Sequence, residues 1–256
     1  MPTIQSAQTH NGDVLLVTGG GRGIGAAIVR EAATRGYAVG FSYQSDTQAA
    51  QSLVGELAAG GGRVQAVKGD VADASFASSF FDKISAEFGP VTAVVNNAGI
   101  TGRLGAFSDV PTDILRRTID VNLLGTMFMA REAIRRWQAS SIPGRLVNIS
   151  SVAATLGSPG EYVHYAATKG AVDTLTIGLG KEVAASGIRV NAVAPGTAYT
   201  DIHGAGGDPD RPARVVSRVP IGRIAQPEEI AKTVLWLLSD EASYVTATVL
   251  RVGGGV

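Results

Sequence analysis

Short runs of valine, leucine, isoleucine and alanine alternate along this chain with longer segments in which apolar residues recur at helical spacing. Near-continuous apolar runs are typical of strands buried on both faces, and the segments between them are typical of crossover helices. Seven strands are predicted at Val14–Thr18, Ala38–Tyr43, Val64–Lys68, Val91–Asn96, Leu146–Ser150, Arg189–Val193 and Thr248–Val252. Helices are predicted between them at Ile24–Thr34, Thr47–Ala59, Ser75–Phe88, Thr112–Trp137, Tyr162–Ala185 and Pro227–Leu238. The pattern predicts an α/β fold with one doubly wound, seven-stranded parallel sheet and helices on both faces.

One segment interrupts the alternation. Residues 197–220 contain too many helix breakers for a continuous helix, namely Gly204, Gly206, Gly207, Pro209, Pro212 and Pro220. Long loops in compact domains are often functional, so we interpret this segment as a mobile substrate flap, with a merely disordered excursion as the alternative. We expect a flexible amino-terminal tail over residues 1–12 and a single domain over residues 13–256.

Composition narrows the possible partners. Lysine plus arginine balance aspartate plus glutamate at 22 each, so the chain projects no strong field toward nucleic acid or an anionic membrane. The chain has no cysteine, and its three histidines, His10, His164 and His203, lack the spacing of paired metal ligands. No signal peptide or long apolar run is evident. We therefore expect a cytoplasmic protein without a metal, whose partners are small molecules or copies of itself.

A glycine-rich turn follows the first predicted strand and opens the first predicted helix. It reads Thr18-Gly19-Gly20-Gly21-Arg22-Gly23-Ile24-Gly25. Glycines at such a turn let the backbone approach a pyrophosphate closely, and the helix N-terminus supplies free N–H groups and the positive end of the helix dipole. Because strand, turn and helix follow in the required order, this motif indicates nucleotide binding in preference to a tight structural turn.

Tyr165 and Lys169 lie four positions apart in a predicted helix, which places them on nearly the same face, one turn apart. A neighbouring cation favours the phenolate, so Lys169 could lower the pKa of Tyr165 from about 10 toward neutrality. The pair is a candidate for proton exchange with an alcohol or ketone oxygen. Taken alone, the pair is also compatible with two amphipathic residues on a helix surface.

Six motifs in order resemble the short-chain dehydrogenase/reductase family over nearly the whole chain. They are the glycine turn, Asn96-Asn97-Ala98-Gly99, Asn122, Ser151, Tyr165-x-x-x-Lys169 and Pro195-Gly196. The resemblance implies a Rossmann-type fold and hydride transfer between a nicotinamide and a carbonyl or alcohol. It implies that Tyr165 is the general acid or base, and that Lys169 lowers the pKa of Tyr165 and holds the nicotinamide ribose. It also implies that Ser151 hydrogen-bonds the substrate oxygen, and that Asn122 positions a water that relays protons.

The cofactor would lie along the carboxyl ends of the strands. The expected cofactor-binding residues are Gly19, Arg22, Gly23, Ile24, Gly25, Tyr43, Gln44, Ser45, Asp70, Val71, Asn97, Ala98, Gly99, Tyr165, Lys169, Pro195, Gly196 and Thr200. The catalytic serine has an alternative, because Ser150 precedes Ser151 and successive strand positions face opposite ways. We choose Ser151 from the family pattern, although it lies one residue farther from Tyr165 than is usual.

The end of the second predicted strand bears on the coenzyme. An NAD enzyme usually places a carboxylate there, about 20 residues beyond the glycines, whereas this chain has Tyr43. Arg22 could neutralise a 2′-phosphate, with hydrogen bonds from Ser42, Gln44 and Ser45. We therefore predict NADP in preference to NAD. Asp46 opposes this prediction, because an inward-turned carboxylate would repel the phosphate.

We expect the substrate to be a small ketone, a secondary alcohol or a sugar. The residues expected near the cleft are small, aromatic or polar, namely Val152, Ala153, Gly157, Tyr162, His164, Tyr199 and His203. Alternatives are a 3-oxoacyl thioester reductase of the same family and a non-catalytic dinucleotide-sensing protein. The family resemblance also implies a homotetramer, with the helices at residues 112–137 and 162–185 at one interface. The last strand usually builds the second subunit interface in the family. In this strand, Arg251 and Val252 depart from the family pattern.

Overall fold

The computed structural model describes residues 12–256, except for the side chain of His203, and confirms the seven-stranded parallel sheet. Its strands are β1 Val14–Val17, β2 Ala38–Tyr43, β3 Val64–Lys68, β4 Ala93–Asn96, β5 Arg145–Ile149, β6 Arg189–Pro195 and β7 Val249–Val252. They lie in the order β3-β2-β1-β4-β5-β6-β7, and every neighbouring pair is parallel. Apart from Gly12, the expected amino-terminal tail lies outside the described residues.

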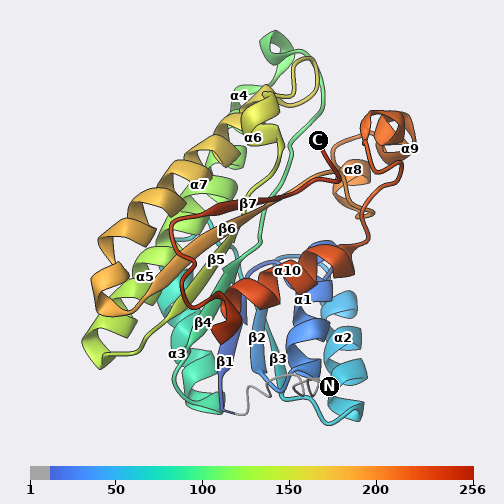
Figure 1. Cartoon of the computed structure of the whole chain (residues 1–256). Coiled ribbons are helices and arrows are strands. Elements are labelled where there is room, and N and C mark those ends of the chain that lie inside the picture. The colour runs from blue at the N-terminus through green and yellow to red at the C-terminus, as the bar shows by residue number, and fades with distance from the viewer. Residues whose placement is uncertain (1–11) are drawn as a thin grey trace, which may run out of the picture.

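Helices cover both faces of the sheet (Figure 1). On one face lie α1 Gly23–Thr34, α2 Thr47–Ala59 and α10 Pro227–Leu238, and on the other lie α3 Phe76–Phe88, α4 Thr112–Ile119, α5 Gly125–Ser140 and α7 Val163–Glu182. Short α6 Ala153–Leu156, α8 Ile202–Ala205 and α9 Arg211–Val215 follow β5 and β6, and 3₁₀ turns occupy Phe107–Asp109, Ala184–Ser186, Val216–Arg218 and Asp240–Ala242.

The two hydrophobic cores follow from the alternation of side chains along each strand. In β1, Leu15 packs with α1 and α10, whereas Leu16 packs with α3 and α5. Both leucines are fully buried. Burial of each such side chain stabilises the fold by about 1.5–3 kcal/mol. A strand that is apolar on both faces gains this stabilisation only where helices cover both sides of the sheet.

The strand order places a crevice between β1 and β4. The chain runs outward from β1 through β2 to β3, then returns to build the other half from β4 onward. Ligands of such sheets bind beyond the carboxyl ends of the strands at this switch point. Here Thr18 Oγ1 accepts hydrogen bonds from the N–H groups of Asn97 and Ala98, each at 3.0 Å. The glycine turn is thereby fixed against the end of β4.

The helix predicted over Thr112–Trp137 is interrupted, which corrects the sequence-based expectation. A wider π-helical turn occupies Asp120–Leu124, between α4 and α5. Asn122 lies in this turn and is fully buried. Its Nδ2 donates to the Ile100 carbonyl at 2.8 Å, and its Oδ1 accepts the Ile100 N–H at 2.9 Å. Single π turns often occur at functional sites, and apolar periodicity gives no sign of their extra residue.

The segment at residues 197–220 contains α8, α9 and one 3₁₀ turn, and no continuous helix, as predicted. It lies near the carboxyl terminus of the chain, above the end of β7 in Figure 1. Val215 and Val219 form a small apolar cluster with Ile224, against which Val256 packs. We call residues 197–220 the flap below; its mobility stays a prediction.

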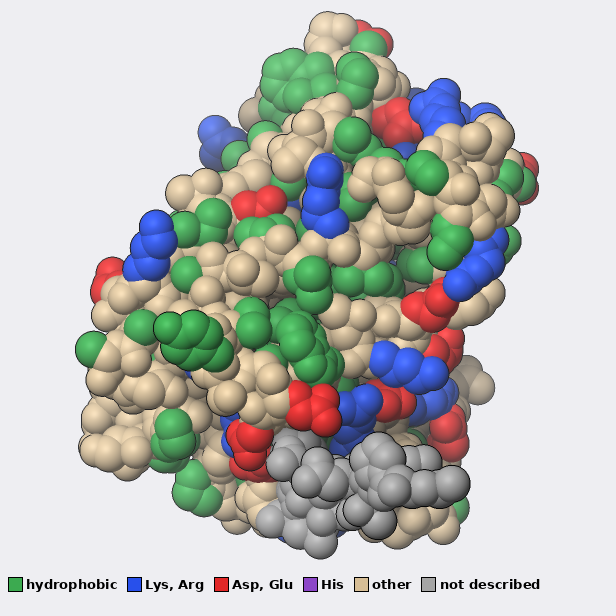
Figure 2. Space-filling model, in the orientation of Figure 1, with side chains coloured by type: hydrophobic (Ala, Val, Ile, Leu, Met, Phe, Trp, Pro, Cys, Tyr) green, Lys and Arg blue, Asp and Glu red, His purple; other side chains and the backbone are tan. Residues whose placement is uncertain are grey.

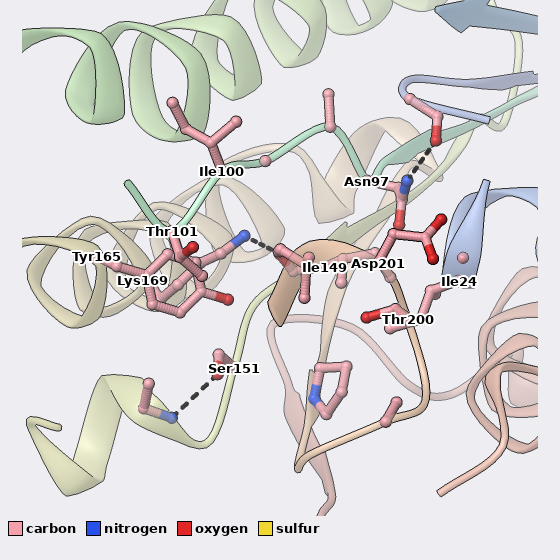
Figure 3. A pocket seen from close by; sticks show the side chains of 18 of the residues that line it. Ile24, Asn97, Ile100, Thr101, Ile149, Ser151, Tyr165, Lys169, Thr200 and Asp201 are labelled. Carbon is pink, nitrogen blue, oxygen red and sulfur yellow. Dashed lines mark hydrogen bonds between the residues drawn. The ribbon is translucent and has the colours of Figure 1, made fainter. Parts of the chain in front are cut away.

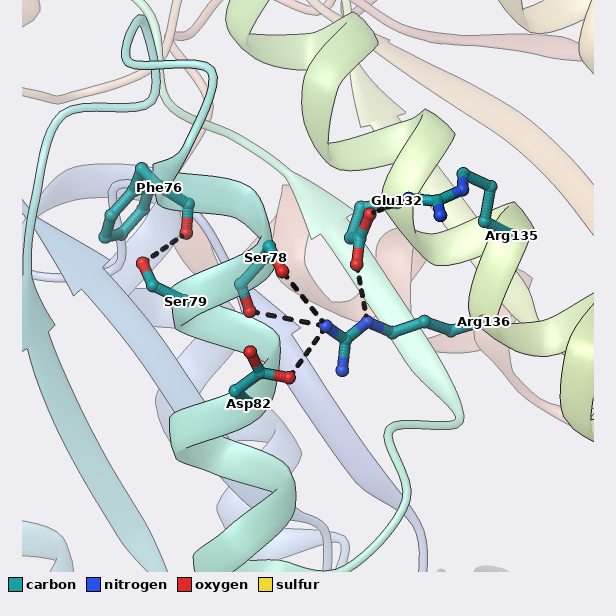
Figure 4. A network of polar contacts seen from close by, with 7 residues as sticks. All are labelled: Phe76, Ser78, Ser79, Asp82, Glu132, Arg135 and Arg136. Carbon is teal, nitrogen blue, oxygen red and sulfur yellow. Dashed lines mark hydrogen bonds and ion pairs between the residues drawn. The ribbon is translucent and has the colours of Figure 1, made fainter.

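Polar contacts fasten the helices on one face. Arg136 of α5 contacts Asp82 of α3 and Glu132 of its own helix, each at 2.7 Å (Figure 4). Partly exposed ion pairs of this kind contribute about 0–1 kcal/mol to the stability of the fold. Apolar burial therefore holds these helices together, and the ion pairs only add to their orientation. Basic and acidic side chains are interspersed on the face shown in Figure 2. Within residues 12–256, no helix has the length and apolar character needed to cross a membrane.

Candidate active site

A cavity of about 850 Å³ opens at the carboxyl ends of the strands. This volume lies within the usual range for small-molecule and cofactor sites. Every cofactor-binding residue predicted from the sequence lines the cavity, from Gly19 in the first turn to Thr200 in the flap. In the described part of the chain, no cluster of three histidine, aspartate or glutamate side chains could hold a metal ion.

The glycine turn fits a pyrophosphate. Gly19 and Gly23 have φ angles of +64° and +53°, which favour glycine. A Cβ atom on Gly25 would lie 2.2 Å from the Gly19 carbonyl oxygen and 2.5 Å from Asn97 Nδ2, so a side chain there requires the turn to move. Helix α1 begins at Gly23 without a side-chain cap. The N–H groups of its first turn are thereby available to an anion at the positive end of the helix.

A charged network forms the far end of the cavity. Asp70 pairs with Arg117 of α4 at 2.8 Å and accepts a hydrogen bond from Gln44 Nε2 at 3.1 Å. Arg117, which no sequence motif singled out, also lines the cavity. Asp46 caps α2, where its Oδ1 accepts the Ala49 N–H at 2.9 Å. One carboxylate oxygen of Asp46 is therefore committed to the helix.

Ser151, Tyr165 and Lys169 meet at the opposite end of the cavity. Figure 3 shows Tyr165 and Lys169 side by side on α7, with Ser151 facing them from the segment after β5. The Ser151 hydroxyl lies close enough to the Tyr165 phenol to act on its pKa, which it lowers. Lys169 Nζ donates to the Ile149 carbonyl at 2.6 Å and lies 5.6 Å from the centroid of the Tyr165 ring. The structure thus brings together three of the four predicted catalytic residues.

The electrostatics of this group differ from the sequence-based expectation. Burial raises the pKa of Tyr165 to about 12, although the Ser151 hydroxyl acts in the opposite direction. Burial also lowers the pKa of Lys169 to about 8, against the attraction of Asp173. The expected lowering of the Tyr165 pKa by Lys169 is therefore not seen in the chain alone. The ammonium group lies over the ring face, bonded to a backbone carbonyl, and both groups have lost their hydration.

Asn122, the fourth predicted catalytic residue, does not line the cavity. Its side chain forms hydrogen bonds with the Ile100 backbone, and its Nδ2 donates to Thr168 Oγ1 at 3.1 Å. Gly99 lies beside both Asn122 and Lys169, because a Cβ atom there would lie 3.4 Å from Asn122 Oδ1 and 3.6 Å from Lys169 Nζ. The Asn122 side chain therefore contacts the loop after β4 and helix α7, and its water relay stays a prediction.

The two adjacent serines have different surroundings. Ser150 is buried, and its Oγ lies 3.4 Å from the Lys169 carbonyl oxygen and interacts with Asp173. Ser151 faces Tyr165, and its Oγ accepts the Ala153 N–H at 3.1 Å. This contrast favours Ser151 as the group that contacts a substrate oxygen.

Replacement of Ser151 by alanine should lower kcat by about 10²-fold, because a donor to the developing oxyanion is lost. Ser150→Ala should cost markedly less, since its hydroxyl supports the backbone of α7. Steady-state kinetics of the two variants side by side will measure the difference. A larger loss in Ser150→Ala would transfer the role to Ser150.

The residues expected around the substrate are only partly correct. Val152, Ala153 and Tyr162 line the cavity, whereas Gly157, His164 and Tyr199 do not. Tyr199 instead lines a second hollow of about 460 Å³ beside α1 and α2. The side chain of His203 lies outside the described part of the structure.

Three residues that the sequence analysis did not assign to the substrate side also line the cavity, namely Leu156, Glu161 and Arg211. They come from α6, the turn before α7, and the flap. In a sequence, a charged loop residue that faces a cavity cannot be distinguished from one that is exposed to solvent. Only the fold reveals which of them turn inward.

Comparisons with known proteins find relatives over nearly the whole chain. The family model described as enoyl-(acyl carrier protein) reductase matches residues 19–256. The oxidoreductase YgfF of Escherichia coli K12 is 44% identical over 244 residues, 94% of this chain and 99% of the relative. An L-rhamnose 1-dehydrogenase (NAD(P)(+)) of Sphingomonas sp. strain SKA58 is 41% identical, covering 96% of each chain. A blue fluorescent protein from a metagenomic library, solved with NADPH, is 34% identical with a TM-score of 0.87, covering 97% of this chain and 99% of that one.

These matches span the glycine turn, the crevice and the flap together, and they are similarities of the whole chain. The matching family model and the extent of identity agree with the motifs that the structure gathers around one cavity. The chain therefore belongs to the short-chain dehydrogenase/reductase family, and it is an oxidoreductase of alcohols and ketones that uses a nicotinamide dinucleotide.

Proposed function

We propose that residues 13–256 form one domain that uses NADP to interconvert a small ketone and its secondary alcohol, or to oxidise a sugar, with Tyr165 as general acid and base. The observation that carries this proposal is the meeting of Ser151, Tyr165 and Lys169 at the end of a cavity whose other end is the glycine turn. A nicotinamide supplies hydride transfer, which leaves the chain to orient the substrate and move one proton.

The roles follow from the state of each side chain. The raised pKa of Tyr165 keeps the phenol protonated at neutral pH, as a donor to a carbonyl oxygen must be. Lys169, with its pKa lowered to about 8, is mostly charged at pH 7 and can hold ribose hydroxyls. Oxidation of an alcohol requires the phenolate, so its rate should rise with pH, whereas reduction should fall only above the pKa of Tyr165.

The coenzyme preference rests on Arg22. Its side chain lines the cavity between the glycine turn and Ser45, and the described residues provide no ion-pair partner for it. Asp46, the residue that opposed NADP, lines the cavity, but one of its carboxylate oxygens caps α2. Gln44, however, donates to Asp70, so Arg22 carries most of the expected interaction with a 2′-phosphate.

Replacement of Arg22 by alanine should raise KM for NADP by about 10-fold and leave KM for NAD within about two-fold, because only NADP carries the 2′-phosphate. Arg35→Ala, at the other end of α1, is the matched control. Michaelis constants for both coenzymes will measure the effect. A wild-type enzyme that clearly prefers NAD would refute the coenzyme assignment.

The substrate is proposed to be small and partly polar. Tyr162, Glu161 and Arg211 offer polar groups beside the proposed proton donor, and Val152 and Leu156 offer apolar ones. A screen of ketones, aldoses and secondary alcohols with both coenzymes tests this proposal. A 3-oxoacyl thioester in the same screen tests the alternative acyl substrate, which is supported by 35% identity to a 3-oxoacyl-[acyl-carrier-protein] reductase of Staphylococcus aureus. Cofactor binding without consumption on any substrate would instead support a dinucleotide sensor.

We also propose a homotetramer. Apolar side chains remain exposed on the helices expected at an interface, namely Ile119, Leu124, Met127 and Ile177. Covering them with a second copy would remove apolar surface from water. Sedimentation equilibrium will give the number of subunits.

A further inference from the structure

Arg211 is the most buried cation of the flap, with 9% of its surface exposed. It lies at the first position of α9 and lines the cavity. Its Nη2 and Nε atoms lie 2.7 and 3.1 Å from Glu161 Oε2. A buried guanidinium is costly unless it is paired, so this ion pair fixes α9 to the turn that precedes α7.

The guanidinium also contacts the aromatic pair at the start of α7. Its Cζ atom lies 5.0 Å from the centroid of the Tyr162 ring. Tyr162 in turn packs edge-on against Tyr165, with ring centroids 5.2 Å apart. Such cation–π and aromatic contacts are attractive, and more so when shielded from water. A continuous series of contacts therefore runs from the flap to the proposed proton donor.

The charges around Tyr165 come from three elements. Lys169 lies on its own helix, and Asp173 faces Lys169 from one turn farther along. Tyr162 and Glu161 lie at the turn before α7, and Arg211 comes from α9. Arg211 acts to lower the pKa of Tyr165, whereas burial and Tyr162 raise it. Arg211, paired with Glu161, thus places a guanidinium of the flap near the phenol, on the Tyr162 ring that packs against it.

We propose that Arg211 is a positioning residue for Tyr165, which through Tyr162 holds the phenol in place and supplies a positive charge that favours the phenolate. The inference rests on the proposed function, because it assigns a role relative to Tyr165 as proton donor. It links the position of the flap to the state of the proton donor, because displacement of α9 would remove both the ring contact and the charge.

The test is the pH profile of alcohol oxidation at saturating NADP, with Arg211→Met, Arg211→Gln and Arg211→Lys. The two neutral variants should move the midpoint of the alkaline rise upward by about half a unit, equivalent to about a three-fold smaller phenolate population at a given pH. Arg211→Lys should restore the midpoint. Arg223→Met is the control, because it removes an exposed ion pair with Glu229 of the same 2.7 Å length, away from the cavity.

Arg211→Gln keeps polar contacts if Arg211→Met fails to fold, and thermal unfolding of each variant shows which are folded. Unshifted midpoints in the folded neutral variants, with only a pH-independent loss of rate, would overturn the inference and leave Arg211 with a purely structural role. Failure of the proposed function has a different signature: wild-type enzyme without NADP-linked turnover, or a Tyr165→Phe variant that keeps it.

Discussion

The Tyr165→Phe variant is expected to lose at least about 10³-fold in kcat, because it removes the hydroxyl proposed to give a proton to the substrate oxygen. Lys169 is bonded to the Ile149 carbonyl, and Ser151 is a far weaker acid than a phenol. The fold should survive, since the ring remains to pack against Tyr162 and only one hydroxyl is removed. NADP binding should change by less than about three-fold, which corresponds to less than one kcal/mol.

Initial rates and a fluorescence titration with NADPH will separate these two expectations. Tyr244→Phe is the matched control, because its side chain is fully exposed and lies away from the cavity. If Tyr165→Phe keeps more than about a tenth of wild-type kcat, the proton must come from another group, and the role of Tyr165 is wrong.

Replacement of Lys169 by methionine should have the next largest effect. The variant removes the ammonium group that lies 5.6 Å from the Tyr165 ring and leaves the Ile149 carbonyl without its donor. Losing a buried donor of this kind costs about 1–3 kcal/mol, and a further loss arises in ribose binding. We expect kcat to fall by at least about 10²-fold and the dissociation constant of NADP to rise by about 10-fold.

Turnover and NADPH titration will measure both effects, with Lys181→Met near the end of the same helix as the control. Lys169→Arg should not restore activity, because the bulkier guanidinium must fit a site where only 4% of the lysine surface is exposed. If Lys169→Met keeps both normal NADP affinity and normal kcat, the proposed parts of Lys169 in turnover and in ribose binding are wrong.

The fold could be predicted from the sequence because its signals are strong and repeated. Strands β2 and β3 and helices α2 and α10 begin and end at the predicted residues. Many of the other ends differ by one to three residues, where apolar runs fade into turns. The π turn at Asn122 could not be foreseen, because a single inserted residue leaves the apolar pattern on both sides intact.

The site could be predicted as a set of residues, but its electrostatics could not. Tyr165 and Lys169 share a helix face as their spacing requires, yet the spacing does not tell how far each is buried. Burial dominates both pKa values, and it depends on the whole fold. Arg211 illustrates the same limit: in the sequence it is one arginine among prolines and aspartates, and only the packing of α9 turns it inward.

A crystal structure of the enzyme with NADP and a ketone substrate would show directly whether Tyr165 is the proton donor. The carbonyl oxygen should lie about 2.6–3.2 Å from both the Tyr165 hydroxyl and Ser151 Oγ, with the pyrophosphate on the turn from Gly19 to Gly25. A ketone oxygen bound by other side chains, or a cofactor outside this cavity, would contradict this proposal.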